Sequence, residues 1–216
     1  MLVLSHRGFR LEAPENTLEA FGRAVEIGAD GIETDVRLSH DGLPVLFHDR
    51  VAPDGREVAG LTAAELSAVA GYPVPTLPQA LARWDRILWN VEVKTPAALG
   101  VTLEVLEALP PGRRLLVSSF WHPLVAACAR RGFEGGLLLA SRPVDDEAFF
   151  ALFPADERIR TAVWDYEILD PDLASRAAER GIRTWVYGVH TPAEHRRCVE
   201  LGLDGVITDR VDWLRG

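Results

Sequence analysis

The chain has 216 residues, of which 48% are hydrophobic, and a formal net charge of −9 at pH 7. This length predicts a single domain over residues 1–216 with a large core, and the negative charge argues against nucleic acid or an anionic membrane as partner. There is no apolar run near 18 residues and no basic signal region at the start, so we expect neither a membrane span nor secretion.

Short apolar runs alternate with helix-like segments along the chain. Nine runs are candidate strands: 2–6, 30–36, 44–48, 88–94, 114–119, 136–140, 160–164, 184–189 and 205–208. From residue 114 onward they begin every 21 to 24 residues, which is the length of a βα unit and predicts a parallel sheet.

Capping signals mark the helices between these runs. Asn16, Thr62 and Thr191 each precede a glutamate by three residues, the pattern of an N-cap followed by an acidic N3 residue. Glycines are expected to end the helices, at Gly28, Gly132, Gly181 and Gly202.

One connection is too short for a parallel crossover. Only residues 40–43 precede the run 44–48, whereas a crossover needs a dozen or more residues. Asp41-Gly42 instead predicts a two-residue hairpin turn, which would place Asp35 opposite His48. The other eight runs then predict an α/β fold, a TIM (β/α)8 barrel with a β-hairpin over its C-terminal mouth.

Acidic residues alternate with apolar ones on the second and third barrel strands. Glu33, Asp35 and Glu92 lie opposite the apolar, helix-facing side, so we expect three carboxylates to meet inside the barrel mouth. A divalent cation, Ca²⁺ or Mg²⁺, accounts for them better than a protonated carboxyl or an arginine–glutamate network. Replacing Glu33 or Asp35 by its amide is expected to relieve their repulsion in the metal-free protein.

Two histidines and two cations belong to the same predicted mouth. His6 ends the first strand and His48 ends the hairpin, and a pair of imidazoles can act as general acid and base near neutral pH. Arg7 and Lys94, the only lysine in the chain, can neutralise phosphate oxygens. Together with a metal these groups indicate phosphoryl transfer, although Lys94 could instead only balance the carboxylates.

The ordered motifs resemble those of the glycerophosphodiester phosphodiesterase family. They are HRG at 6–8, PENT at 14–17, GIETDV at 31–36, DG at 41–42, HD at 48–49, NVEVK at 90–94, SSF at 118–120 and GLDGVITD at 202–209. The resemblance implies a TIM barrel that uses Ca²⁺ or Mg²⁺ to split small-molecule glycerophosphodiesters into sn-glycerol 3-phosphate and an alcohol. It also implies site residues: metal ligands Glu33, Asp35 and Glu92, acid–base pair His6 and His48, and phosphate contacts Arg7 and Lys94.

Other residues around the predicted pocket are open to two interpretations. Phe120 either packs on the glycerol carbons or belongs to the core. The family's Trp-Thr-Val-Asn appears here as Tyr187-Gly188-Val189-His190, and His190 either lines the pocket or caps the next helix. His40, His122 and His195 are expected to be surface or loop residues.

Two cysteines, Cys128 and Cys198, form no disulfide framework or metal motif, so we expect small core residues in a cytoplasmic protein. Two alternative functions stay open. One is a phospholipase of the same fold acting on lipid phosphodiesters, and the other is a non-catalytic phosphate- or cation-binding barrel. The sequence leaves open the choice of metal ion, the alcohol, the attacking nucleophile (water or the glycerol C2 hydroxyl) and the oligomeric state.

Overall fold

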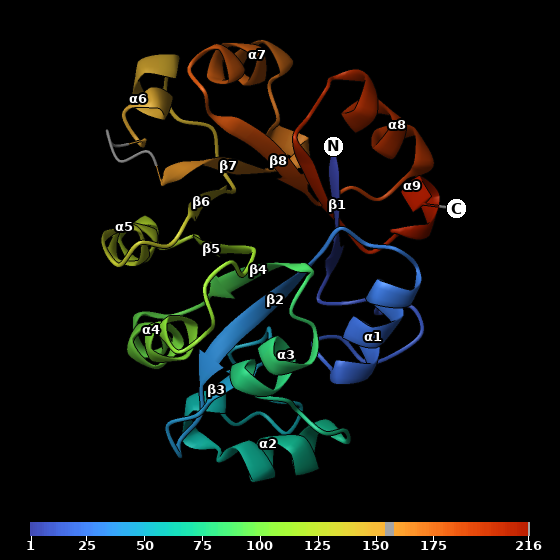
Figure 1. The fold of residues 1–216 in the computed structure, drawn as a ribbon, viewed down its shortest axis with the longest axis vertical. Coiled ribbons are helices and arrows are strands. Elements are labelled where there is room, and N and C mark those ends of the chain that lie inside the picture. The colour runs from blue at the N-terminus through green and yellow to red at the C-terminus, as the bar shows by residue number, and fades with distance from the viewer. Residues whose placement is uncertain (154–157, 216) are drawn as a thin grey trace.

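Eight parallel strands of the protein form a closed ring. A computed structural model of the chain describes residues 1–153 and 158–215. The ring consists of β1 (Leu2–His6), β2 (Gly31–Leu38), β4 (Leu88–Val93), β5 (Leu115–Ser119), β6 (Gly135–Leu139), β7 (Ile159–Asp165), β8 (Arg183–Tyr187) and β9 (Gly205–Thr208). Since β1 pairs with both β2 and β9, the sheet closes into the predicted TIM barrel (Figure 1).

Helices surround this ring (Figure 1). They are α1 (Leu18–Glu26), α2 (Ala63–Ala70), α3 (Leu77–Arg83), α4 (Leu99–Glu107), α5 (His122–Arg130), α6 (Asp146–Phe150), α7 (Pro171–Glu179), α8 (Pro192–Glu200) and α9 (Asp212–Arg215). All nine predicted runs are strands, with ends that differ from the predictions by at most two residues. In the described part of the chain, no helix is long and apolar enough to cross a membrane.

Helix capping follows the sequence at two of three predicted N-caps. Thr62 and Thr191 both form complete capping boxes with the glutamates three residues on. The first helix is different, because Thr17 rather than Asn16 is its N-cap and accepts a hydrogen bond from Ala20 N. The prediction for Asn16 is therefore wrong, and its side chain serves the site described below.

Apolar side chains fill both the outside and the inside of the ring. On β4, Trp89, Val91 and Val93 pack outward against the helices, as the alternation predicts. A separate cluster lies inside the ring and consists of Leu4, Leu88, Leu116, Leu138, Val163, Trp185 and Ile207. The barrel is therefore plugged by apolar side chains beneath its polar mouth.

The burial predicted for three other residues can be compared with the structure. Cys128 and Cys198 are buried in the two outer clusters, as expected. The surface position expected for His195 is wrong: it is 1% exposed on α8, and its Nε2 lies 2.7 Å from Thr208 Oγ1 on β9. The helix face, rather than a loop, positions this imidazole.

The hairpin has a three-residue turn in place of the predicted two-residue turn. β3 (Pro44–Leu46) runs antiparallel to the extension of β2, as predicted. Ser39 N donates to Leu43 O at 3.0 Å, so residues 40–42 form the turn. Gly42 has a φ of 78°, and three-residue hairpin loops commonly end on such a left-handed glycine.

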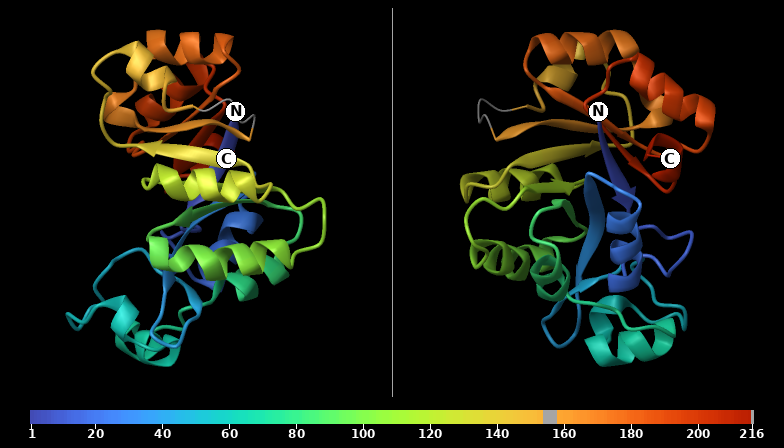
Figure 2. Two further views of the ribbon diagram at one scale, coloured as in Figure 1. Left: turned by 90° about the vertical axis from the view of Figure 1, so that its left-hand side faces the viewer. Right: turned by 45° about the vertical axis from the view of Figure 1, so that its right-hand side comes forward.

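This turn shifts the predicted hairpin register by one residue. Phe47, not His48, pairs with Asp35, through a 3.0 Å bond from Phe47 N to Asp35 O. His48 lies one position further and still reaches the mouth, where Arg37 Nε donates to its carbonyl oxygen at 2.8 Å. Figure 2 shows the hairpin and α2 at one end of the molecule, beyond the ring, where they share a small apolar cluster.

Candidate active site

Three carboxylates meet at the barrel mouth, as predicted. Glu33, Asp35 and Glu92 are all buried, and each offers an oxygen that lies within 4.8 Å of the other two. The strand register explains this, because Asp35 on β2 is the direct neighbour of Glu92 on β4. Carboxylates this close repel one another strongly unless cations balance them.

Two cations balance part of this charge. Lys94 Nζ lies 2.7 Å from Glu92 Oε1 and 3.2 Å from Asp35 Oδ1. Arg7 Nε lies 3.2 Å from Asp35 Oδ2. Glu33 forms fewer contacts with cations and donors. In the described structure its Oε2 accepts one hydrogen bond, from the backbone N–H of Arg7 at 3.1 Å. Its other oxygen, Oε1, is buried and has no hydrogen-bond partner among the described residues.

The carboxyl groups accordingly differ in their pKa values. Burial, and then the charges of Asp35 and Glu92, raise the pKa of Glu33 well above its usual value. Burial also raises the pKa of Glu92. Burial opposes ionisation of Asp35 too, but Lys94 and Arg7 outweigh it, so the pKa of Asp35 is lowered. The direction of the pKa shift of Glu33 favours relief of repulsion in Glu33→Gln, whereas that of Asp35 predicts a loss of stabilising pairs in Asp35→Asn.

The acidic cluster can hold a divalent metal ion. Its donor set is made only of carboxylate oxygens, the ligands that Ca²⁺ and Mg²⁺ prefer. Within the described chain, the buried Glu33 Oε1 has no protein donor, and a cation would satisfy it. Glu33, Asp35 and Glu92 are the residues that would bind the ion.

The HRG turn directs the end of β1 into the site. Arg7 and Gly8 both have a left-handed backbone, with φ values of 56° and 80°. A side chain at Gly8 would place its Cβ 2.7 Å from the backbone carbon of Ala20, so only glycine fits against α1 there. Because of this turn, Arg7 N donates to Glu33 O at 2.9 Å while its guanidinium lies beside Asp35.

Asn16 is a site residue that the sequence analysis missed. Its Nδ2 donates to Asp35 Oδ2 at 2.9 Å, and its Oδ1 accepts from Thr34 Oγ1 at 2.7 Å. The left-handed φ of 58° is one that asparagine tolerates better than most residues. Asn16 therefore orients Asp35, and its place in the PENT motif was the signal available in the sequence.

Each catalytic histidine candidate has a carboxylate at Nδ1. His6 Nδ1 lies 2.8 Å from Asp209 Oδ1, and His48 Nδ1 lies 2.8 Å from Asp49 Oδ1. The Nε2 atoms are thereby left for a ligand, and that of His6 lies 4.0 Å from Glu33 Oε2. Sequence analysis assigned no role to Asp209, although it ends the GLDGVITD motif.

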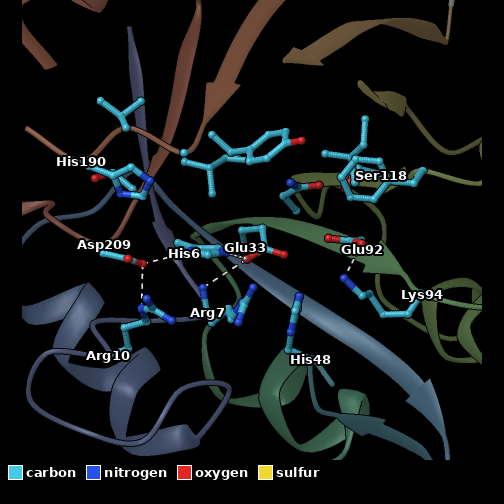
Figure 3. A pocket seen from close by; sticks show the side chains of 18 residues that line it. His6, Arg7, Arg10, Glu33, His48, Glu92, Lys94, Ser118, His190 and Asp209 are labelled. Carbon is cyan, nitrogen blue, oxygen red and sulfur yellow. Dashed lines mark hydrogen bonds and ion pairs between the residues drawn. The ribbon is translucent and has the colours of Figure 1, made fainter. Parts of the chain in front are cut away.

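These groups border one cavity of about 300 Å³ at the barrel mouth (Figure 3). His6, Arg7, His48 and Lys94 line it together with Glu33 and Glu92, whereas Asp35 lies behind Arg7 and Lys94 and is not exposed to it. The structure therefore gathers the predicted ligands, histidines and cations in one place.

The opposite part of the cavity is aromatic. Phe120 is 44% exposed and meets Tyr187 edge to face, with ring centroids 6.1 Å apart. Phe120 therefore lies at the cavity and not in the core. His190 also lines the cavity, while its backbone N–H donates to Glu194 Oε2 at 2.7 Å at the start of α8.

The fold and the site define a TIM-barrel protein whose mouth combines a buried acidic cluster, able to hold a metal ion, with two histidines and two cations. The chain belongs to the glycerophosphoryl diester phosphodiesterase family, whose model matches residues 6–131 and 139–213. This confirms the family that the ordered motifs indicate.

Individual relatives agree over almost their whole length. The glycerophosphodiester phosphodiesterase of Caldanaerobacter subterraneus is 29% identical over 96% of this chain and 93% of that protein. The crystal structure of a glycerophosphodiester phosphodiesterase from Thermotoga maritima matches with a TM-score of 0.87 at 29% identity, over 99% of this chain and 96% of that one. An Oleispira antarctica phosphodiesterase, in complex with the product sn-glycerol-3-phosphate, shares the fold with a TM-score of 0.83 at 24% identity, over 97% and 93% of the chains.

Proposed function

We propose that this protein is a single-domain enzyme, over residues 1–216, that hydrolyses glycerophosphodiesters to sn-glycerol 3-phosphate and an alcohol. The observation that carries the proposal is the buried acidic cluster lying beside two histidines and two cations at one cavity. Membership of the family and the product-bound relative from Oleispira antarctica support the substrate class. Glu33, Asp35 and Glu92 would hold one divalent cation, Ca²⁺ or Mg²⁺.

The phosphate group would be bound by the ion at the acidic cluster and by the side chains of Arg7 and Lys94. When bound, the metal ion polarises a phosphate oxygen and neutralises charge that develops on it. The guanidinium of Arg7 can donate to two phosphate oxygens, whereas Lys94 supplies a compact charge. Both side chains already lie beside the carboxylates, within 3.2 Å of Asp35, and so are held where a phosphate would meet the ion.

Proton transfer is divided between the two histidines. Burial lowers the pKa of His48, which favours the neutral imidazole that a general base needs to deprotonate water or the C2 hydroxyl. Asp209 Oδ1 lies 2.8 Å from His6 Nδ1 and orients the ring so that Nε2 can act as the general acid toward the leaving alcohol. Attack by water would give the product directly, and attack by the C2 hydroxyl would give a cyclic phosphate first.

Alanine at either histidine tests this division. His6→Ala and His48→Ala should each lower kcat on glycerophosphocholine by roughly 10² to 10⁴. p-Nitrophenol leaves without protonation, so a p-nitrophenyl diester of glycerol phosphate should restore turnover in His6→Ala and not in His48→Ala. Rescue of His48→Ala alone would exchange the two roles, and equal rescue of both variants, or of neither, would contradict separate roles.

One observation favours the phospholipase of the same fold as the second candidate. Phe120 and the adjacent Trp121 are 44% and 56% exposed, and such an aromatic pair could touch a lipid surface. Metal-supplemented protein should release choline from glycerophosphocholine and none from phosphatidylcholine vesicles. Comparable rates on vesicles would favour the lipid enzyme, and hydrolysis of neither substrate would leave a non-catalytic binding barrel.

We also propose a cytoplasmic location for this enzyme. Two free cysteines, Cys128 and Cys198, support this location, because they are buried and unpaired in the described chain, as is usual in a reducing compartment.

A further inference from the structure

Two neutral polar side chains face the cavity with unused hydrogen-bonding atoms. Asn90 on β4 and Ser118 on β5 both line the cavity and are both 0% exposed. Among the described residues, no partner exists for Nδ2 or Oδ1 of Asn90 or for Oγ of Ser118. Buried amides and hydroxyls without partners destabilise a fold, so these atoms point to a ligand that completes them.

The strand register places these two residues directly beside the charged groups. Asn90 is the neighbour of Glu33 on the adjacent strand, and Ser118 is the neighbour of Glu92. In Figure 3, Ser118 and Glu92 lie on one side of the cavity and Asp209 lies on the other. A ligand whose phosphate meets the acidic cluster can therefore extend toward β5 and reach the neutral pair.

The surroundings of the neutral pair suit a short chain of carbon atoms. Phe120 and Tyr187, whose ring centroids lie 6.1 Å apart, line the same cavity, and so does Leu138 from β6. Below, the apolar cluster inside the ring closes the barrel. The cavity therefore offers apolar contacts and hydrogen-bonding groups to a small ligand.

The unpaired atoms select a hydroxyl group among the possible partners. The Asn90 amide offers a donor at Nδ2 and an acceptor at Oδ1, and the Ser118 hydroxyl can do either. A phosphate oxygen only accepts, so it would leave Oδ1 unpaired, and an ammonium group only donates, so it would leave Nδ2 unpaired. A hydroxyl both donates and accepts and can satisfy the whole set.

We propose that Asn90 and Ser118 bind the terminal hydroxyl of the glycerol moiety, the one farthest from phosphorus. The C2 hydroxyl is one carbon closer to the phosphate, whereas the terminal hydroxyl can extend past Glu92 to Ser118 on the neighbouring strand. This inference rests on the proposed function. Binding of the terminal hydroxyl would make the site specific for a glycerol group that carries no acyl chain. An ester at that oxygen has no proton to donate to Oδ1 of Asn90, so an acylated substrate would leave this buried atom unpaired.

Binding of the product and of an analogue without the terminal hydroxyl tests the inference. Isothermal titration calorimetry on metal-loaded protein would compare sn-glycerol 3-phosphate with the matched enantiomer of propane-1,2-diol 1-phosphate. Wild-type protein should bind the product about 10- to 100-fold more tightly, since the analogue leaves buried polar atoms unpaired. Asn90→Leu and Ser118→Ala should weaken product binding and leave analogue binding unchanged. The ratio of the two dissociation constants, which defines the preference, should then approach 1.

Ser5→Ala is the matched control. Ser5 is also 0% exposed with an unpaired Oγ within the described structure, but it does not line the cavity, so its variant should keep the wild-type preference. Absence of a preference in wild-type protein would overturn the inference. Equal weakening of product and analogue binding in Asn90→Leu and Ser118→Ala would also overturn it, as would a wild-type preference retained by both variants. Turnover of glycerophosphocholine reports separately on the proposed function, because the preference in binding needs no catalysis.

Discussion

Glu33→Gln and Asp35→Asn should each reduce hydrolysis of glycerophosphocholine by at least about 10³-fold, because each removes a charged ligand from the proposed metal site. Their effects on the metal-free protein should have opposite signs. Within the described site Glu33 forms no ion pair with Arg7 or Lys94, its nearest basic side chain is His6 at 4.0 Å, and its Oε1 is buried without a donor. Glu33→Gln should therefore raise Tm in chelator by a few degrees.

Asp35→Asn should instead lower the stability of the metal-free protein. Lys94 and Arg7 both pair with Asp35, so the amide removes one anionic partner from each of two largely buried cations, which keep Glu92 and Glu15 respectively. Breaking such a buried pair costs about 3 kcal/mol, or roughly 6–12 °C in Tm for a chain of this size. Thermal unfolding of both variants in chelator measures the difference, and equal shifts for the two would contradict the charge distribution described above.

The stabilisation in Glu33→Gln should also depend on pH. Folding raises the pKa of Glu33 above the ordinary value of 4.5, so the folded state binds this proton more tightly than the unfolded chain does. The free energy of unfolding of the wild-type protein therefore falls as pH rises from about 4.5 toward the folded pKa. The glutamine variant cannot ionise at this position, so its free energy of unfolding does not show this fall. Its advantage in Tm should be small at pH 4 and larger at pH 7, and an advantage that shrinks as pH rises would contradict the raised pKa.

Lys94→Met should lower kcat/KM on glycerophosphocholine by roughly 10² to 10⁴ if the ammonium neutralises phosphate charge that grows in the transition state. Lys94→Arg should recover little, because the longer planar guanidinium cannot place a compact charge at the same point. The structure also pairs Lys94 with Glu92 and Asp35, so its removal should tighten metal binding. The two consequences are measured in one variant, as metal affinity and as kcat at saturating metal.

The value of kcat at saturating metal separates the two roles of Lys94. A low kcat together with tighter metal binding is the expected result. Tighter metal binding with an unchanged kcat would show that Lys94 is only a counter-ion for the carboxylates, and Arg7 would then be the remaining cationic contact to the phosphate.

The barrel and its acidic cluster were predictable because period-2 alternation and strand spacing are local signals. Glu33, Asp35 and Glu92 share one face of two neighbouring strands, and the structure brings them within 4.8 Å as that alternation requires. His6 and His48 were also predictable, since His6 ends β1 and His48 lies two residues beyond β3, and both strand ends had to lie at the mouth.

Two of the missed features depend on contacts between distant segments, and the third depends on the length of one turn. Asn16 looks like a helix cap in the sequence, and only the folded chain places its amide against Asp35, 19 residues away. Asp209 meets His6 across 203 residues. The hairpin register depends on whether the turn closes over two residues or three, which Asp41-Gly42 alone does not specify.

The most direct test of metal-dependent diester hydrolysis is a ³¹P NMR time course on glycerophosphocholine with chelated protein, followed by addition of Ca²⁺ or Mg²⁺. The substrate signal should persist in chelator, and the signal of sn-glycerol 3-phosphate should grow only after the cation is added. Turnover that continues in chelator, or the appearance of phosphocholine in place of sn-glycerol 3-phosphate, would contradict the proposed reaction.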